Sequence, residues 1–476
     1  MVSSQTGLFE GQSPLQYDAS NPIILFLFQV VIILIVSHLV HLVLSRLYQP
    51  RVVSEVVGGL ILGPSVLGHV PDYMDTLFPA SAKPVFTAAS TLGLIFLMFL
   101  VGLETDLTVV RKHWRSATAV AGLGIIIPFG LGVAVAVGLY HHIESRNENA
   151  ASFGVFVLFV GLAMAITAFP VLARILMELD LLTSPVGLIA LSAGVANDVV
   201  GWTLLGVSVA LAQASSGEVA VYMLLCCIGW ALLMVYGIRP LLRRFVRSSL
   251  SEASNPADIQ LAAISLLVLV SALFTGMIGI HPIFGAFLAG AIVPKEGGYH
   301  EKLELRFAPV IYNVLLPPFF ALSGINTNIS GLTSGVDWGY VVAVCSIAFV
   351  GKVIGGFIAA KLCKIKTRES WTIGVLMSCK GIVELIALNI GLQAGIISQE
   401  TFTIFVVMAV ILTGLTQPLV RWLFPMSLRD PHGQIYTSKS EQSLVQSSQS
   451  TSERVLPSPH ETSEKPSMVF GVRETC

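Results

Sequence analysis

The sequence predicts an all-α polytopic membrane protein. Of its 476 residues, 54% are hydrophobic and 12% are charged, whereas a soluble globular chain carries about 25% charged residues. The mean hydropathy is +0.81. The apolar residues gather in long runs, many of them near the roughly 20 residues that a helix needs to cross a bilayer. The chain has too few polar residues to cover the surface of a water-soluble protein. We therefore expect lipid to be the solvent for much of the chain.

Thirteen apolar runs, separated by charged or Gly/Pro-rich breaks, are the candidate membrane spans. The first run is too long for the apolar part of a cleaved signal peptide, and no Lys or Arg precedes it, so we expect a retained span. The second and ninth runs are the shortest. The thirteen runs are residues 21–47, 52–68, 85–103, 114–141, 151–180, 184–212, 218–240, 258–279, 281–294, 307–324, 336–362, 370–395 and 400–424.

The distribution of Lys and Arg predicts the orientation. If the N-terminus lies outside, the outer loops hold only Lys83 and Arg146, and most of the 27 cations fall in inner loops. Because Lys and Arg collect in cytoplasmic loops, we expect a short extracytoplasmic or lumenal N-terminus at 1–20 and a transmembrane domain at 21–425. Residues 426–476 are rich in Ser, Thr, Gln and Pro, which predicts a disordered cytoplasmic tail.

Several function classes find no support in the composition. The formal net charge of −1 argues against a nucleic-acid partner. None of the six cysteines forms a CxxC pair, so we expect neither a disulfide framework nor a metal site. The chain has no nucleophile elbow or phosphate-binding loop, so we expect no enzyme activity and no cofactor.

Asp198 is the most informative single residue, because it lies near the centre of the sixth apolar run. A charged residue there costs about 2.5 to 3.5 kcal/mol on insertion scales and usually marks a functional site. A buried carboxylate needs a proton or a counter-ion, so it holds one or the other. That exclusion predicts an exchanger. The alternative is an Asp that braces helix packing. The adjacent Asn197 offers either a neutral cation ligand or a packing hydrogen bond between helices.

The fifth run is too long for a simple span. Thirty helical residues extend about 45 Å, beyond a hydrocarbon core of about 30 Å. Its centre contains Thr167, Phe169 and Pro170, and Pro removes a backbone donor from a helix. We therefore expect a broken helix, which transporters use to bind ions. A simple kink at the proline is the alternative.

The twelfth run has a matching defect at Lys380, Gly381 and Glu384. Lys380 and Glu384 are four residues apart and can pair on one helix face, and we expect a second break beside that pair. The fifth and twelfth runs are an odd number of spans apart, so they have opposite orientations. Two interrupted helices in corresponding places of inverted repeats predict a transporter binding site.

Lys352 lies inside the eleventh run. Its depth makes snorkelling to the interface difficult. We expect an ion pair with Asp198 instead, in which a proton arriving at the carboxylate frees the lysine.

The chain also resembles the monovalent cation:proton antiporter-2 family, and within it the fungal K+/H+ antiporters and plant cation/proton exchangers. The resemblance covers about residues 20–425. The matching stretches follow the family's order and are Gly58–Ser65, Phe99–Glu104, Ala165–Leu176, Asn197-Asp198, Gly279–Phe287, Leu322–Gly324, Gly351-Lys352 and Lys380–Ile386.

This resemblance implies a sodium/proton antiporter-like fold with a moving core domain, a dimerisation domain and a homodimeric assembly. It implies that Asp198 carries the ion or proton and that the Asn at 197 accompanies electroneutral exchange. It places Lys352 near the Asp, and Thr167 and Pro170 at the helix crossing. Two features depart from the family: a short tail replaces a folded cytosolic domain, and Ser378-Cys379 replaces the usual Asn-Thr.

The leading hypothesis is exchange of K+ or Na+ for H+ by alternating access, with membrane lipid as the surroundings. A cation channel or leak is the first alternative, although the sequence contains no filter-like run. A proton-coupled transporter of an organic solute on the same scaffold is the second. The sequence leaves open the choice between K+ and Na+ and between an internal membrane and the plasma membrane.

Overall fold

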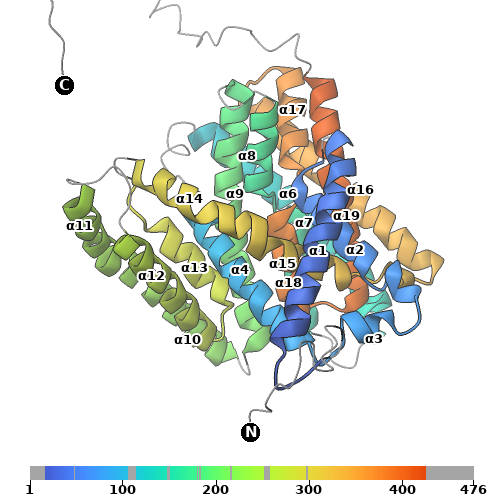
Figure 1. Ribbon diagram of the computed structural model, residues 1–476. Helices are drawn as coiled ribbons and strands as arrows, with labels where there is room; N and C mark the ends of the chain where they lie inside the picture. Colours follow the sequence, from blue (N-terminus) through green and yellow to red (C-terminus); the bar gives the residue numbers. More distant parts are fainter. Residues whose placement is uncertain are drawn as a thin grey trace, which may run out of the picture. The chain divides into compact units, whose positions relative to one another are not determined.

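A computed structural model describes the protein over residues 15, 17–47, 49–104, 114–146, 151–179, 181, 184–214, 217–250, 258–295 and 298–424. All regular secondary structure in these residues is helical (Figure 1). The chain divides into two units, Met1–Met426 and Ser427–Cys476. The predicted disordered tail and most of the predicted extracytoplasmic N-terminus lie outside the described residues. The described helices all belong to the first unit.

The helices that carry the candidate site form one bundle, which we call the site bundle. Within it, α6 packs against α7, α9 and α16, and α16 packs against α17 and α19. Its members are α6 (Trp114–His142), α7 (Phe153–Ala165), α8 (Phe169–Glu178), α9 (Pro185–Gln213), α16 (Gly335–Leu362), α17 (Thr367–Met377), α18 (Ile382–Gln393) and α19 (Gln399–Leu423).

A second group of helices, the flanking bundle, packs beside the first. Here α4 packs against α13 and α15, and α2 packs against α1 and α15. Its members are α1 (Ile23–Leu44), α2 (Arg51–Leu62), α4 (Lys83–Glu104), α12 (Asp258–Met277), α13 (Pro282–Ala291), α14 (Tyr299–Val310), the π-helix η6 (Ile311–Leu315) and α15 (Leu316–Ile325). Direct packing of α15 on α18 and of α2 on α19 joins the two bundles.

One long helical segment connects the bundles in sequence. After α9, the chain forms α10 (Gly217–Leu232), the π-helix η4 (Leu233–Ile238) and α11 (Arg239–Leu250) before it enters α12, all in green in Figure 1. Of these, α10 packs on α9. The remaining short elements are η1 (Ser45–Leu47), η2 (Leu67–His69), α3 (Tyr73–Leu77), η3 (Glu144–Arg146) and η7 (Ile329–Gly331).

The predicted all-α membrane architecture is confirmed. Eleven helical segments within the described residues are long and apolar enough to cross a bilayer. Two shorter apolar helices, at Pro282–Ala291 and Val383–Gln393, correspond to the ninth and twelfth predicted spans. A helix of ten or so residues extends about 15 Å, half of a hydrocarbon core. The predicted total of thirteen spans is therefore not confirmed by helix length.

Candidate functional site

The predicted break in the fifth span is present. The helix α7 ends at Ala165 and α8 begins at Phe169, and the backbone of Ile166 and Ala168 between them is extended. Pro170 lies in the first turn of α8, where its missing N–H leaves no helical hydrogen bond unmade. The proline therefore starts a new helix and does not kink a continuous one.

The predicted second break is also present, between the end of α17 at Met377 and the start of α18 at Ile382. Gly381, at the N-cap of α18, has φ +151° and ψ −134°, a region that residues with a side chain rarely adopt. A Cβ atom at this position would lie 2.6 Å from Cγ2 of Val171 in α8. The glycine thus allows both the break and the close approach of α8.

Hydrogen bonds hold the two breaks against each other. The N–H of Ala168 donates to the carbonyl of Cys379 at 3.3 Å, and the Cys379 thiol lies 3.6 Å from the carbonyl of Ala168. Thr167 Oγ1 donates to the carbonyl of Met377 at 2.7 Å. Backbone groups that the breaks remove from helical pairing are thus partly satisfied by hydrogen bonds to the other break, as burial requires. The two interrupted helices cross at these residues.

Asp198 lies beside this crossing, in the middle of α9. Its side chain is 3% exposed, and neither carboxylate oxygen has a hydrogen-bond partner. The Phe169 N–H, at the start of α8, is near enough to favour a negative charge on the carboxylate, but it does not reach hydrogen-bonding geometry. A helix N-terminus carries a partial positive charge. Both carboxylate oxygens of Asp198 therefore lie near the positive end of α8 and accept no hydrogen bond from the protein.

Asn197 connects α9 to the first break. Its side-chain oxygen accepts from the Thr167 N–H at 2.9 Å, and its amide nitrogen donates to the Ala165 carbonyl at 3.4 Å. Of the two alternatives raised by the sequence, the geometry matches the packing hydrogen bond. Asn197 holds both ends of the broken segment in place next to Asp198.

Lys352 is fully buried, but the predicted direct ion pair with Asp198 is wrong for this structure. Its Nζ donates to Thr167 Oγ1 at 2.7 Å, and no ion pair joins Lys352 to Asp198 within the described part of the chain. The break frees the Thr167 hydroxyl from a helix, which places an acceptor closer to the ammonium than the carboxylate is.

Lys380 and Glu384 form the predicted pair, with Nζ 2.9 Å from Oε2 and both side chains fully buried. The same Nζ donates to the carbonyls of Ala163 at 2.7 Å and Met164 at 3.1 Å. These carbonyls belong to the last turn of α7, where the helix dipole is negative. Lys380 therefore neutralises the end of one broken helix from the start of the other.

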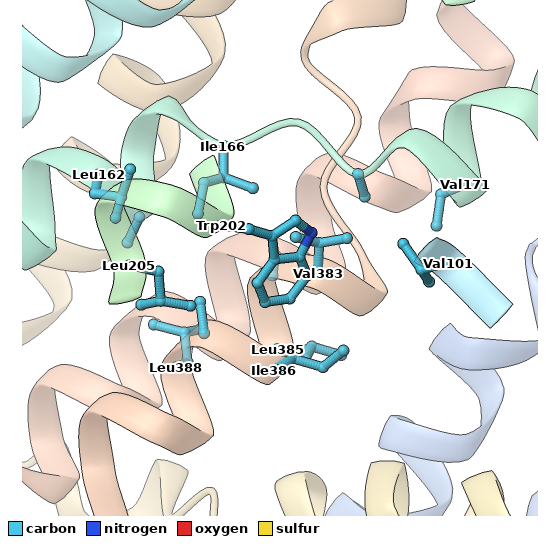
Figure 2. Close-up of a cluster of buried hydrophobic side chains, with 14 of the residues drawn as sticks. Val101, Leu162, Ile166, Val171, Trp202, Leu205, Val383, Leu385, Ile386 and Leu388 are labelled. Carbon is cyan, nitrogen blue, oxygen red and sulfur yellow. The ribbon is translucent and has the colours of Figure 1, made fainter. Parts of the chain in front are cut away.

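Apolar side chains surround the crossing. Figure 2 shows Trp202, one turn after Asp198 in α9, among Ile166, Leu205 and Val383. The Trp202 ring also contacts Phe284 of α13, edge to face, at a centroid distance of 6.3 Å. Such packing excludes water on this side of the carboxylate, and charges interact strongly in a poorly hydrated site.

The structure adds residues that the sequence analysis missed. Asn389 of α18 donates to Ser323 of α15 at 2.7 Å, and both are buried. This hydrogen bond crosses between the two bundles. A lone Asn inside an apolar run was the available signal, and its partner is distant in sequence.

Together these groups place the buried carboxylate of Asp198 beside two crossed helix breaks. A desolvated carboxylate needs a proton or a cation as its compensating charge. Broken helices at membrane depth occur where they line a transport site. Two crossed, interrupted helices of this kind are typical of secondary transporters.

The chain belongs to the sodium/hydrogen exchanger transmembrane family, whose model matches residues 30–423. It is 41% identical over 434 residues to K(+)/H(+) antiporter 1 of Saccharomyces cerevisiae, covering 90% of this chain and 50% of the yeast protein. It is 37% identical over 425 residues to cation/H(+) antiporter 19 of Arabidopsis thaliana, covering 89% of this chain and 52% of the plant protein. The chain thus spans about half the length of these relatives.

Two further proteins match over almost their whole length. The Na(+)/H(+) antiporter NhaS4 of Synechocystis sp. is 35% identical over 407 residues, which are 85% of this chain and 98% of that protein. The structure of the sodium proton antiporter MjNhaP1 from Methanocaldococcus jannaschii superposes with a TM-score of 0.51 at 16% identity, over 86% of this chain and 98% of that one. The structural match concerns the fold.

Proposed function

We propose that this chain exchanges a monovalent cation, K+ or Na+, for H+ by alternating access, with Asp198 as the carrier of both. The observation that supports the proposal is the buried carboxylate of Asp198, which has no hydrogen-bond partner and lies beside two crossed helix breaks. A proton and a cation compete for these oxygens because the desolvated site favours a single compensating charge.

One carboxylate carrier supports an electroneutral exchange. Asn197, the neighbour of Asp198, is neutral, and its side chain is hydrogen-bonded to Thr167 and Ala165. A single acid then binds one cation or one proton in each half of the cycle, so no net charge crosses the membrane.

The arrangement of the two bundles supports a rocking motion as the transport step. The Asn389–Ser323 hydrogen bond and the contacts of α15 with α18 and of α2 with α19 are the connections that such a motion would rearrange. Repeats that move as bodies around a fixed midplane site are the usual basis of alternating access.

The same proposal includes the orientation and the assembly. The cations of the α16–α17 turn and of α11 would face the cytoplasm, and Lys83 the outside. For a homodimer, α1 presents an apolar face at four-residue intervals, with exposed Ile23, Leu27, Val31, Ile35 and Leu39. Contiguous apolar surface of this kind meets lipid or a second copy.

Proteoliposomes that contain the purified chain and a fluorescent pH indicator test this function. We expect K+ or Na+ added to one side to collapse a pH gradient, at a rate that is unchanged when a membrane potential is clamped to zero. Cation flux without proton movement would indicate a channel or leak. A pH response to organic solutes but to neither cation would indicate the other alternative, and both results would contradict the proposal.

A further inference from the structure

The helical segment Gly217–Leu250 is longer than a bilayer requires. Its parts α10, η4 and α11 follow one another without a gap, and at 1.5 Å per residue they extend about 50 Å. The hydrocarbon core is about 30 Å thick, so an end of the segment must leave it. The π-helix η4 lies at the transition between α10 and α11. Segments of π-helix are rare in proteins, and many of those that occur lie at functional sites.

The first part of this segment faces lipid. Within the apolar span Val221–Val246, only 6% of the most apolar 18 residues are buried in the protein. Tyr222, Leu225, Ile228 and Leu232 are more than half exposed, and their spacing of three or four residues places them on one helix face. Acyl chains are the chemistry that covers such a face within a bilayer.

The last part carries positive charge where the first part leaves the hydrocarbon. The sequence of α11 begins Arg-Pro-Leu-Leu-Arg-Arg and contains no acidic residue. Arg244 is exposed, and Nε of the half-buried Arg239 is buried without a hydrogen-bond partner. Tyr236, in η4, is 76% exposed, as expected for an aromatic residue at the level of the head groups.

We propose that α11 binds an anionic phospholipid of the cytoplasmic leaflet, with the phosphate at Arg239, Arg243 and Arg244 and an acyl chain along α10. Charge complementarity selects this occupant: clustered arginines directly beyond a membrane helix attract anionic head groups, and the exposed face of α10 continues the contact into the hydrocarbon. A free phosphate would use only the arginines.

The bound lipid would influence transport through α9. Because α10 packs on α9, which carries Asp198, fixing the inner end of the α10–α11 segment also restrains the site bundle. We therefore expect the exchange rate to depend on anionic lipid. This consequence for the rate depends on the proposed exchange function, whereas the binding itself does not.

A pair of double variants tests the binding. Arg239→Gln/Arg244→Gln removes two charges from α11, and Lys364→Gln/Lys366→Gln removes two exposed charges from the α16–α17 turn as a matched control. Native mass spectrometry of the full chain in detergent would measure retained phosphatidylserine and phosphatidylcholine. We expect the α11 variant to bind phosphatidylserine at least about tenfold more weakly, and the control to bind it like the wild type.

Thermal unfolding provides the second measurement. Phosphatidylserine should raise the unfolding temperature of the wild type and the control but not of the α11 variant, and inorganic phosphate alone should have no effect. Equal protection by inorganic phosphate would show an anion site without a lipid, and an equal lipid response in both variants would show that the lipid binds elsewhere. Either result would overturn the proposal.

Transport then tests the consequence. In proteoliposomes of phosphatidylcholine with and without phosphatidylserine, we expect a several-fold faster exchange with phosphatidylserine for the wild type and the control only. If no preparation exchanges cations for protons, the proposed function fails while the binding measurements still decide the lipid site. Binding without any effect on the rate would refute the coupling through α9.

Discussion

The buried pair of Lys380 and Glu384 leads to a stability prediction that the structure makes quantitative. In Lys380→Met, the Glu384 carboxylate loses its partner at 2.9 Å in a fully buried place, and its Oε1 already lacks a hydrogen bond. Breaking such a pair costs about 3–5 kcal/mol. The carbonyls of Ala163 and Met164 also lose their donor, which adds about 1 kcal/mol or more.

Two companion variants separate charge from packing. Glu384→Gln leaves Lys380 with its two carbonyl acceptors, so we expect a smaller loss of stability than in Lys380→Met. The double variant Lys380→Met/Glu384→Leu removes both charges, and replacing a whole buried pair by apolar groups is often close to neutral. The double variant should therefore recover most of the loss.

Thermal unfolding of the detergent-purified chain, followed by fluorescence-detected gel filtration, measures these differences. We expect Lys380→Met to unfold at the lowest temperature and both companion variants to unfold above it. If Lys380→Met unfolds with the wild type, or if the double variant is no more stable than Lys380→Met, the reasoning about an uncompensated buried charge is refuted.

Three further predictions concern two residues at the helix crossing and the buried Glu144 of η3. Gly381→Ala forces a side chain into a glycine conformation and against Val171, and the strained backbone alone costs about 1–3 kcal/mol. We therefore expect a clearly lower unfolding temperature. An unchanged unfolding temperature would contradict the crossing geometry. Thr167→Val removes the acceptor of Lys352, so cation-driven proton flux should fall at least about tenfold. Thr167→Ser keeps the hydroxyl and should retain most of the flux. An equal loss of flux in both variants would assign the effect to the methyl group of Thr167. Burial raises the pKa of Glu144 above its usual value, so the stability that the protonated carboxyl provides is lost as pH rises through the raised pKa. Glu144→Gln should remove this slope and unfold at a higher temperature than the wild type at high pH, and parallel pH profiles of the two proteins would contradict this account.

Much of the site was predictable because membrane burial makes charged residues and helix breakers conspicuous. Asp198 is expensive inside an apolar run, and Pro170 and Gly381 interrupt helices whose surroundings are otherwise uniform. The pairing of Lys380 with Glu384 was predicted from their four-residue spacing, although Lys380 lies in the break before α18 and not on that helix. Each of these features depends on residues close together in the chain, so a single sequence is enough to predict it.

The partners across the crossing were not predictable in the same way. Lys352 binds Thr167 instead of Asp198, because the choice depends on where an extended segment of another helix presents a hydroxyl. The carbonyls that accept from Lys380 and the hydrogen bond between Asn389 and Ser323 also depend on how distant segments pack. Residue types alone do not carry this information.

Cation-dependent proton movement by Asp198→Asn, measured beside the wild type in the same proteoliposomes, tests whether this carboxylate carries the exchanged ions. Asparagine keeps the size of the side chain but has no negative charge with which to bind a proton or a cation. We predict that the wild type couples K+ or Na+ to proton flux and that Asp198→Asn is inactive while it unfolds at a temperature no lower than that of the wild type. An Asp198→Asn protein that exchanges cations for protons at the wild-type rate would show that Asp198 is a structural acid and would contradict the account.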